Sequence, residues 1–259
     1  MAQDYDEKIK TFRDWLKESE KVVFFGGAGV STASGIPDFR SPQGLYSAGR
    51  EKGKPWARYQ PERLLSHSFF VDHTDWFFDY YRTSILHPEA EPNVCHQALA
   101  DWEEQGRMLG VITQNIDGLH QAAGSRKVCE LHGTVLQNHC QKCHKPYKVD
   151  AVLECEGIPY CECGGVIKPD VTLYEESLPA GSIEQAVAWL SQADLLIVAG
   201  TSLAVYPAAG LIRYFGGDRT VLVNLGSTPM DRLADLFIRE DLAKVFADVR
   251  DVYAEEADA

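Results

Sequence analysis

The sequence predicts an α/β protein: a Rossmann-like parallel sheet with helices on both faces, interrupted by a helical insertion and by a small cysteine-containing module. Three observations predict this class. Short β-branched and aromatic runs alternate with segments of helical periodicity, which is the pattern of a parallel sheet covered by helices. The first run, Val22 to Phe25, leads directly into clustered glycines. Two close cysteine pairs mark a module of a different kind.

The main sheet is assembled from segments that lie far apart in the sequence. Residues 5–18 carry apolar side chains at helical spacing, so we expect a helix packed on the first strand. Further strands are predicted at 108–113, 128–131, 195–199 and 220–224, and further helices at 92–106, 181–193 and 242–253. Ligands of such sheets bind beyond the carboxyl ends of the strands, so the turns near residues 114, 200 and 224 are expected at one edge.

Two insertions interrupt these segments. Residues 44–59 mix glycine, basic and aromatic residues without a period, which is typical of a mobile loop that orders over a bound cofactor. Residues 61–71 and 74–86 predict two helices with an aromatic core. The predicted division is 1–40, 88–136 and 169–259 for the Rossmann-like domain, 41–87 for the loop and helical insertion, and 137–168 for the cysteine module.

Composition restricts the possible functions. With 259 residues, 45% of them hydrophobic, the chain can bury a sizeable core. Its formal net charge of -13 argues against direct nucleic-acid binding, which needs a basic surface. A basic protein segment is a suitable partner, although plain solubility explains the charge equally well. Met1 to Lys10 carries no apolar run, and no segment reaches membrane-spanning length, so we expect a cytoplasmic protein without membrane contact.

The glycine-rich turn after the first strand, Gly26 to Ser41, predicts a nucleotide site. Small residues allow the backbone to approach phosphates, and the N–H groups of a helix start meet their charge. The usual dinucleotide fingerprint is only partly present, because the third glycine comes late, at Gly35. The alternative is a tight turn followed by an exposed polar loop.

Polar residues also follow two later strands. Gln114, Asn115 and Asp117 follow the strand at 108–113, where they can hydrogen-bond a ribose or a carboxamide. The alternative is that Asn115 or Asp117 caps a helix. His132 stands beside Gly133 at the end of another strand, where an imidazole can project into a cleft and titrate near neutrality. We expect His120, His139 and His144 to be structural.

Seven cysteines without an export signal favour thiols or a metal site over disulfides. The pairs C-x-x-C and C-x-C are expected to form a tetrahedral thiolate zinc site, which is structural because four thiolates leave no position open for water. Cys155 is an alternative fourth ligand, and we expect Cys95 and Cys129 to be buried thiols. The expected ligands are Cys140, Cys143, Cys161 and Cys163.

The stretch from Gly27 to Ser41 resembles the sirtuins, the NAD-dependent protein deacylases, whose signature reads G-A-G-x-S-x-x-S-G-I-P-D-F-R-S. Further motifs follow in family order, among them E-L-H-G at 130–133. The resemblance implies that acylated proteins or peptides are the substrates, with NAD as co-substrate and one structural zinc. In the family's mechanism the acyl oxygen of the modified lysine attacks C1′ of the nicotinamide ribose and gives an imidate. Nicotinamide, free lysine and O-acyl-ADP-ribose are the products.

The resemblance also implies roles for single residues. His132 is the expected general base on the ribose hydroxyls, and Asn115 is expected at the nicotinamide end. Residues 171–176 and 204–206 are expected to hold an extended peptide by main-chain pairing, and the acids Glu175 and Glu176 to favour basic flanking residues. The cofactor positions that match are Ala28, Thr32, Phe39, Arg40, Gln114, Ile116 and Asp117, with Thr201, Ser202, Asn224, Leu225 and Asp241 at the adenosine end.

A final expectation concerns the acyl group. Sirtuins that remove succinyl groups carry Y-x-x-R in the helix that corresponds to 74–86, whereas Asp79 stands three residues before Arg82 here. An aspartate repels a dicarboxylic acyl tail, so we predict that acetyl-lysine is preferred over succinyl-lysine. A one-residue slip in register supplies a phenol from Tyr80 or Tyr81 and weakens this argument.

Three other functions compete with deacylation. A mono-ADP-ribosyltransferase uses the same NAD site and differs by adding ADP-ribose to an acceptor. A dehydrogenase is disfavoured because the chain has no plain G-x-G-x-x-G. A non-catalytic NAD sensor or a zinc-ribbon interaction module is excluded if nicotinamide is released.

Overall fold

The structure is a computed structural model that describes residues 2–39, 41, 44–45, 53–232 and 234–254. Its larger part is built on a six-stranded sheet in which every pairing is parallel. The strand order is β3-β2-β1-β7-β8-β9. The strands are β1 (Val22–Gly26), β2 (Met108–Thr113), β3 (Val128–Glu130), β7 (Leu195–Ala199), β8 (Arg219–Val223) and β9 (Leu236–Ile238).

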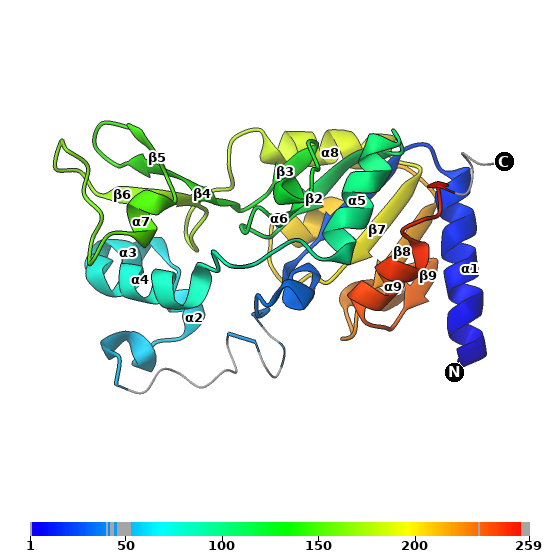
Figure 1. Cartoon of the computed structure of the whole chain (residues 1–259), viewed down its shortest axis with the longest axis horizontal. Coiled ribbons are helices and arrows are strands. Elements are labelled where there is room, and N and C mark those ends of the chain that lie inside the picture. The colour runs from blue at the N-terminus through cyan, green and yellow to red at the C-terminus, as the bar shows by residue number, and fades with distance from the viewer. Residues whose placement is uncertain (1, 40, 42–43, 46–52, 233, 255–259) are drawn as a thin grey trace.

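Apolar residues cover both faces of this sheet. Val22 and Phe24 of β1 belong to one core cluster and Val23 and Phe25 to the other, so the strand is buried on both sides. The first cluster includes residues of α1 (Ala2–Glu18), α5 (Val94–Glu104) and α9 (Leu242–Val249). The second includes residues of α8 (Ser182–Gln192) and of the 3-10 helix Ala208–Tyr214. Figure 1 shows these layers around the sheet.

A smaller body stands beside the sheet, on the left in Figure 1. It contains an antiparallel sheet in the order β5-β4-β6 and several short helices. One core cluster joins aromatic side chains of the helices to Val135 of β4, Val152 of α7 and Val171 of β6. The two insertions therefore share a core. The elements are β4 (Gly133–Cys140), β5 (Pro146–Lys148), β6 (Ile167–Val171), α2 (Pro61–Leu64), α3 (His67–Asp72), α4 (Thr74–Tyr80) and α7 (Asp150–Leu153).

Several predicted elements differ from those observed. The predicted helix at 61–71 is broken at Ser66, which pairs with Tyr174 and caps α3 by accepting a hydrogen bond from the Phe69 amide. The predicted helix at 74–86 ends as α4 at Tyr80 and continues as a π-helix, Tyr81–Ile85. The predicted closing helix ends at Val249 instead of residue 253. Strand β9 has only three residues and was not predicted.

Helix α5 agrees with the sequence prediction, because Asn93 caps it in a capping box with His96. The described helices include none with the length and apolar character that crossing a membrane requires.

Candidate functional site

The predicted site residues gather at the carboxyl edge of the large sheet. Strand β1 lies at the centre, and the chain order reverses between β1 and β7, which is the switch point where ligands bind in doubly wound sheets. The turns that follow four neighbouring strands begin at Gly27, Gln114, Gly200 and Asn224. Those turns therefore lie at the same edge, as predicted.

The glycine turn after β1 is packed tightly against the turn after β7. The Gly29 amide donates to the Gly200 carbonyl oxygen over 2.8 Å. A Cβ atom on Gly27 would lie 2.8 Å from the Thr201 Cβ, and one on Gly29 would lie 2.8 Å from the Gly200 Cα. These two glycines are therefore required for the packing of the protein itself, as well as for the open backbone that a phosphate needs.

A buried serine connects the glycine turn to the polar turn after β2. The Ser31 hydroxyl donates to Asp117 Oδ2 over 2.6 Å and accepts from Asn115 Nδ2 over 3.0 Å. Asp117 Oδ1 accepts from the amide of Leu119, the first residue of α6 (Leu119–Ala122), although the N-cap position of that helix is Gly118 and not Asp117. Ser31 was not among the predicted site residues. Its place in the G-A-G-x-S part of the signature was the available signal.

Gln114 links the ends of three strands. Its side-chain Nε2 donates to Thr201 Oγ1 over 2.9 Å, and its main-chain N–H donates to the main-chain carbonyl oxygen of Gly26. The main-chain carbonyl oxygen of Gln114 lies 2.9 Å from His132 Nδ1. The side chain and main chain of Gln114 thus hold the candidate base against the centre of the sheet edge.

The contact with Gln114 determines the chemistry of His132. A carbonyl oxygen only accepts hydrogen bonds, so Nδ1 must carry the proton and Nε2 keeps the basic lone pair. Burial lowers the pKa of His132, and the hydrogen bond to Gln114 opposes that shift only in part. The neutral, basic form is therefore present at pH 7. Gly133 has φ +76, and a Cβ atom there would lie 1.9 Å from the Asp170 carbonyl oxygen.

The other predicted cofactor residues that the structure describes follow strands of the same sheet, with different surroundings. The Thr32 hydroxyl bonds to the Gly29 carbonyl oxygen, and Ile116 accepts from the Val135 amide. Asp241 caps α9 by accepting from the Lys244 amide, so its carboxylate already has a structural partner. Arg40 lies outside the described residues. Ala28, Phe39 and Asn224 are half-buried, and Ser202 and Leu225 are exposed.

The four predicted metal ligands come together. The sulfur atoms of the four cysteines all lie within 4.8 Å of one another, with Cys140 to Cys163 at 3.4 Å and Cys143 to Cys161 at 3.5 Å. A tetrahedral zinc with Zn–S bonds of about 2.3 Å has sulfur atoms about 3.8 Å apart, so the group fits zinc. The Cys155 thiol is not part of it and contacts the Glu156 carbonyl oxygen.

The segment after β6 is hydrogen-bonded to the helical insertion. The Tyr174 amide donates to Leu65 and its carbonyl accepts from His67, so fewer main-chain groups remain for a peptide. Glu175, with φ +78, accepts from the Ser68 amide and hydroxyl. Glu176 accepts from Lys168 Nζ over 3.1 Å.

Both acids are therefore paired within the chain. Less of their charge is left to attract basic flanking residues, so these pairings weaken the basis of that expectation. Burial acts to raise the pKa of Glu176, but bonds from His67 and other donors, Lys168 among them, outweigh it and leave that pKa below its usual range.

Asp79 of α4 and Arg82 of its extension also have partners within the chain. The Asp79 carboxylate accepts from Trp56 Nε1 over 2.7 Å and from Lys54 Nζ over 3.0 Å. Arg82 donates to the carbonyl oxygens of Val152 and Gly157. Asp79 therefore does not supply the unpaired negative charge on which the argument against succinyl groups was based.

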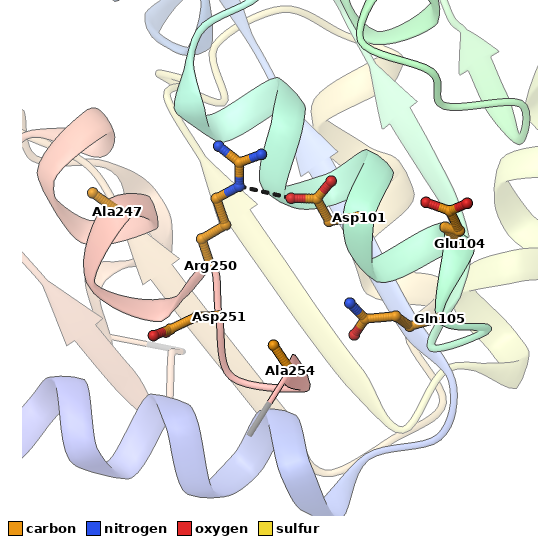
Figure 2. A pocket seen from close by; sticks show the side chains of 7 residues that line it. All are labelled: Asp101, Glu104, Gln105, Ala247, Arg250, Asp251 and Ala254. Atoms are coloured by element: carbon orange, nitrogen blue, oxygen red, sulfur yellow. Dashed lines mark hydrogen bonds and ion pairs between the residues drawn. The ribbon is translucent and has the colours of Figure 1, made fainter. Parts of the chain in front are cut away.

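A surface recess of about 370 Å³ lies away from this site. It is formed by the ends of α5 and α9 and the turn that follows α9, at the opposite edge of the sheet. Figure 2 shows Arg250 bonded to Asp101 on its rim, over 2.6 Å. The recess is open and contains no residue of the polar turns described above.

Comparisons with known proteins agree with the site. A model of the Sir2 family matches residues 27–207. This chain belongs to the Sir2 family. An NAD-dependent protein deacetylase of Clostridium perfringens (strain 13 / Type A) is 50% identical over 248 residues, which cover 95% of this chain and 100% of that protein. The resemblance to the sirtuins, inferred from residues 27–41, is thereby confirmed.

Solved Sir2 structures have the same fold. A Sir2 variant with a deacetylated p53 peptide and 3′-O-acetyl ADP-ribose has a TM-score of 0.82 at 40% identity, over 95% of this chain and 98% of that one. Sir2 with a p53 peptide and NAD+ has a TM-score of 0.80 at 40% identity, over 97% and 99% of the two chains. The large sheet and the cysteine-bearing body of this chain are thus those of a Sir2-family protein.

Proposed function

We propose that this chain is an NAD-dependent protein lysine deacetylase that moves the acyl group from lysine to ADP-ribose and releases nicotinamide. NAD supplies the ADP-ribose that accepts the acyl group. The observation that carries the proposal is His132, which has a basic Nε2 and is held by Gln114 beside the glycine turn. The relatives at 50% identity are NAD-dependent protein deacetylases, which supports the same conclusion.

In this proposal, the side chains of the turns have different roles in binding NAD and in the reaction. His132 acts as general base on a ribose hydroxyl, and the Ser31–Asn115–Asp117 group orients the nicotinamide end of the co-substrate. The glycine turn, with Ala28 and Thr32, faces the phosphates, while Thr201, Ser202, Asn224 and Leu225 contact the adenosine end. Phe39, Arg40 and Ile116 complete the proposed NAD site, and Asp241 acts there only through the start of α9.

The predicted domain and the two insertions bind different components in this proposal. Residues 1–40, 88–136 and 169–259 bind NAD, residues 41–87 cover it, and residues 137–168 hold one structural zinc on the four cysteines. Residues 171–176 and 204–206 hold the acylated peptide. We also propose a cytoplasmic location, because reducing compartments keep thiols available for a metal.

The test is product analysis with an acetylated peptide and NAD. We expect nicotinamide, a peptide that has lost its acetyl mass, and O-acetyl-ADP-ribose in equal amounts. A peptide or protein that gains the mass of ADP-ribose and keeps its acetyl group would establish the transferase instead. Absence of nicotinamide with every acylated peptide would contradict both enzymatic functions.

A further inference from the structure

A tyrosine contacts the cysteine group directly. The Tyr147 hydroxyl, on β5, donates a hydrogen bond to the Cys161 sulfur over 3.1 Å. The ring of Tyr147 packs against the small cluster of Cys140, Cys161 and Ile167. Main-chain pairing with Asn138 of β4 fixes the position of this residue. The phenol is thus aimed at one particular sulfur by the sheet itself.

The receiving sulfur is one of the two buried members of the group. Cys140 and Cys161 are buried, whereas Cys143 is exposed. Main-chain amides of Lys142 and Cys143 donate to the Cys140 sulfur, each over 3.4 Å. Cys161 receives its side-chain hydrogen bond from Tyr147. Both buried sulfurs therefore accept from main-chain amides, Cys161 from that of Cys163, and Tyr147 adds a side-chain donor to Cys161.

A hydrogen bond to a metal-bound thiolate has a direct physical effect. Four thiolates around a zinc ion leave an excess of negative charge, and a donor to one sulfur spreads that charge and fixes the lone pairs of that sulfur. Groups that orient a metal ligand in this way contribute about 10- to 100-fold to metal affinity. Tyr147 also lies under Lys145, whose Nζ is 5.5 Å from the ring centroid and bonds to Glu162.

We propose that Tyr147 is a positioning residue of the metal site: its phenol holds the Cys161 thiolate on the metal and slows metal loss. The proposal rests on zinc binding by the four cysteines and concerns the retention of the metal, not the reaction with NAD.

The experiment compares zinc release from the zinc-loaded wild type, Tyr147→Phe and Tyr160→Phe. The first variant keeps the ring and removes only the donor. Tyr160 lies in the same module, but the residue is 60% exposed and its main chain pairs with Val166. Zinc transfer to an excess of a chromogenic chelator gives the rate, and one zinc per chain in each starting protein shows that the module is folded.

We expect Tyr147→Phe to release zinc about tenfold faster or more, and Tyr160→Phe to match the wild type. Cobalt-substituted proteins give a second measurement, because the sulfur-to-cobalt charge-transfer band should shift in Tyr147→Phe alone. Equal release rates with an unchanged cobalt spectrum would overturn the proposal, and so would equal acceleration in both variants. Neither measurement depends on turnover, so a failure to deacetylate peptides would contradict the proposed function without changing these results.

Discussion

A single main-chain carbonyl determines the state of His132. The Gln114 oxygen accepts from Nδ1, which leaves Nε2 as the base, and burial keeps the ring neutral. The neighbouring Gly133 is equally constrained, because its positive φ and its approach to Asp170 admit no side chain. At the scale of one residue, the protein presents a base whose tautomer is fixed before any substrate arrives.

Replacing His132 with alanine tests this role. We expect deacetylation to fall by about 10²-fold or more, because a positioned base contributes about 10²–10⁴-fold, while NAD binding persists. Single-turnover rates and NAD titration by fluorescence measure the two effects separately. A folded His132→Ala protein with near-normal turnover would remove the residue from the mechanism.

The depressed pKa of His132 predicts the shape of the pH profile. The base must be unprotonated, so activity is retained until the pH falls to the folded-state pKa, which lies below the ordinary value of about 6.5. We expect kcat/KM for the acetylated peptide to be level from about pH 7 to 8, with an acid limb centred below about 6.5. An acid limb centred at pH 7 or above would show that the base is not the buried, neutral imidazole described above.

At the scale of elements, the sequence predicted what local periodicity and capping control. Strands β1, β2, β7 and β8 are continuous buried runs, and Asn93 signals the start of α5, so all five elements follow from local patterns. The break between α2 and α3 depends instead on Ser66 meeting Tyr174, which is 108 positions later in the chain. No local pattern contains that contact, and the internal pairing of Glu175 and Glu176 was missed for the same reason.

The preference for acetyl over succinyl groups now rests on Arg82. Its guanidinium donates to two carbonyl oxygens and lies 5.4 Å above the Phe78 ring centroid. These bonds hold Nε and Nη2 away from a second carboxylate, and a buried carboxylate without a partner is costly. We expect kcat/KM for an acetylated peptide to exceed that of its succinylated form by about tenfold or more, an effect of about 1.4 kcal/mol.

A butyrylated peptide is the matched control, because butyryl and succinyl groups have similar lengths and only one carries a charge. The butyrylated peptide should also react faster than the succinylated one. A succinyl value equal to or above the acetyl value would show that a cation in the site has been overlooked.

At the scale of the whole molecule, the small antiparallel sheet is in contact with both the helical insertion and the segment that carries His132. The helical insertion shares its core cluster with β4, β6 and α7, and the segment after β6 is bonded to His132 through the Thr172 amide. The four-cysteine group includes Cys140, the last residue of β4, whereas His132 immediately precedes the first residue of that strand. Loss of the metal is therefore expected to affect the helices and the base, and not only the module.

Zinc removal tests this dependence. Structural zinc contributes about 10–16 kcal/mol in small peptides, more than the sparse apolar contacts of residues 137–168 can replace. After chelation we expect the amides of β4–β6 and of α2–α4 to lose protection from hydrogen exchange, while those of β1, β2, β7 and β8 keep it. Deacetylation should be lost at the same time. Full activity in zinc-free protein would contradict the coupling.

A pair of buried histidines in the large body is expected to make its stability depend on pH. His96 of α5 and His120 of α6 lie with ring centroids 4.7 Å apart, and both are fully buried. Neither nitrogen of His120 has a hydrogen-bond partner among the described residues. Burial lowers the pKa of His96 to about 4, with Asp117 opposing the shift. Burial and the neighbouring His96 lower the pKa of His120 to about 3.

This pair should make the fold less stable in mild acid. The unfolded chain binds protons at each histidine below about pH 6.5, whereas the folded protein does not until about pH 4 or 3, so the free energy of unfolding falls as the pH drops through that window. Each histidine contributes a loss of about 1.4 kcal/mol between pH 7.5 and 5.5. His120→Leu removes two unpaired nitrogens and replaces the ring with an apolar side chain, so it should be near neutral at pH 7.5 and lose about 1.4 kcal/mol less on acidification. Urea unfolding at the two pH values measures the difference, with the exposed His144→Asn as control. An acid-induced loss in His120→Leu as large as that of the wild type would show that the buried pair does not control stability.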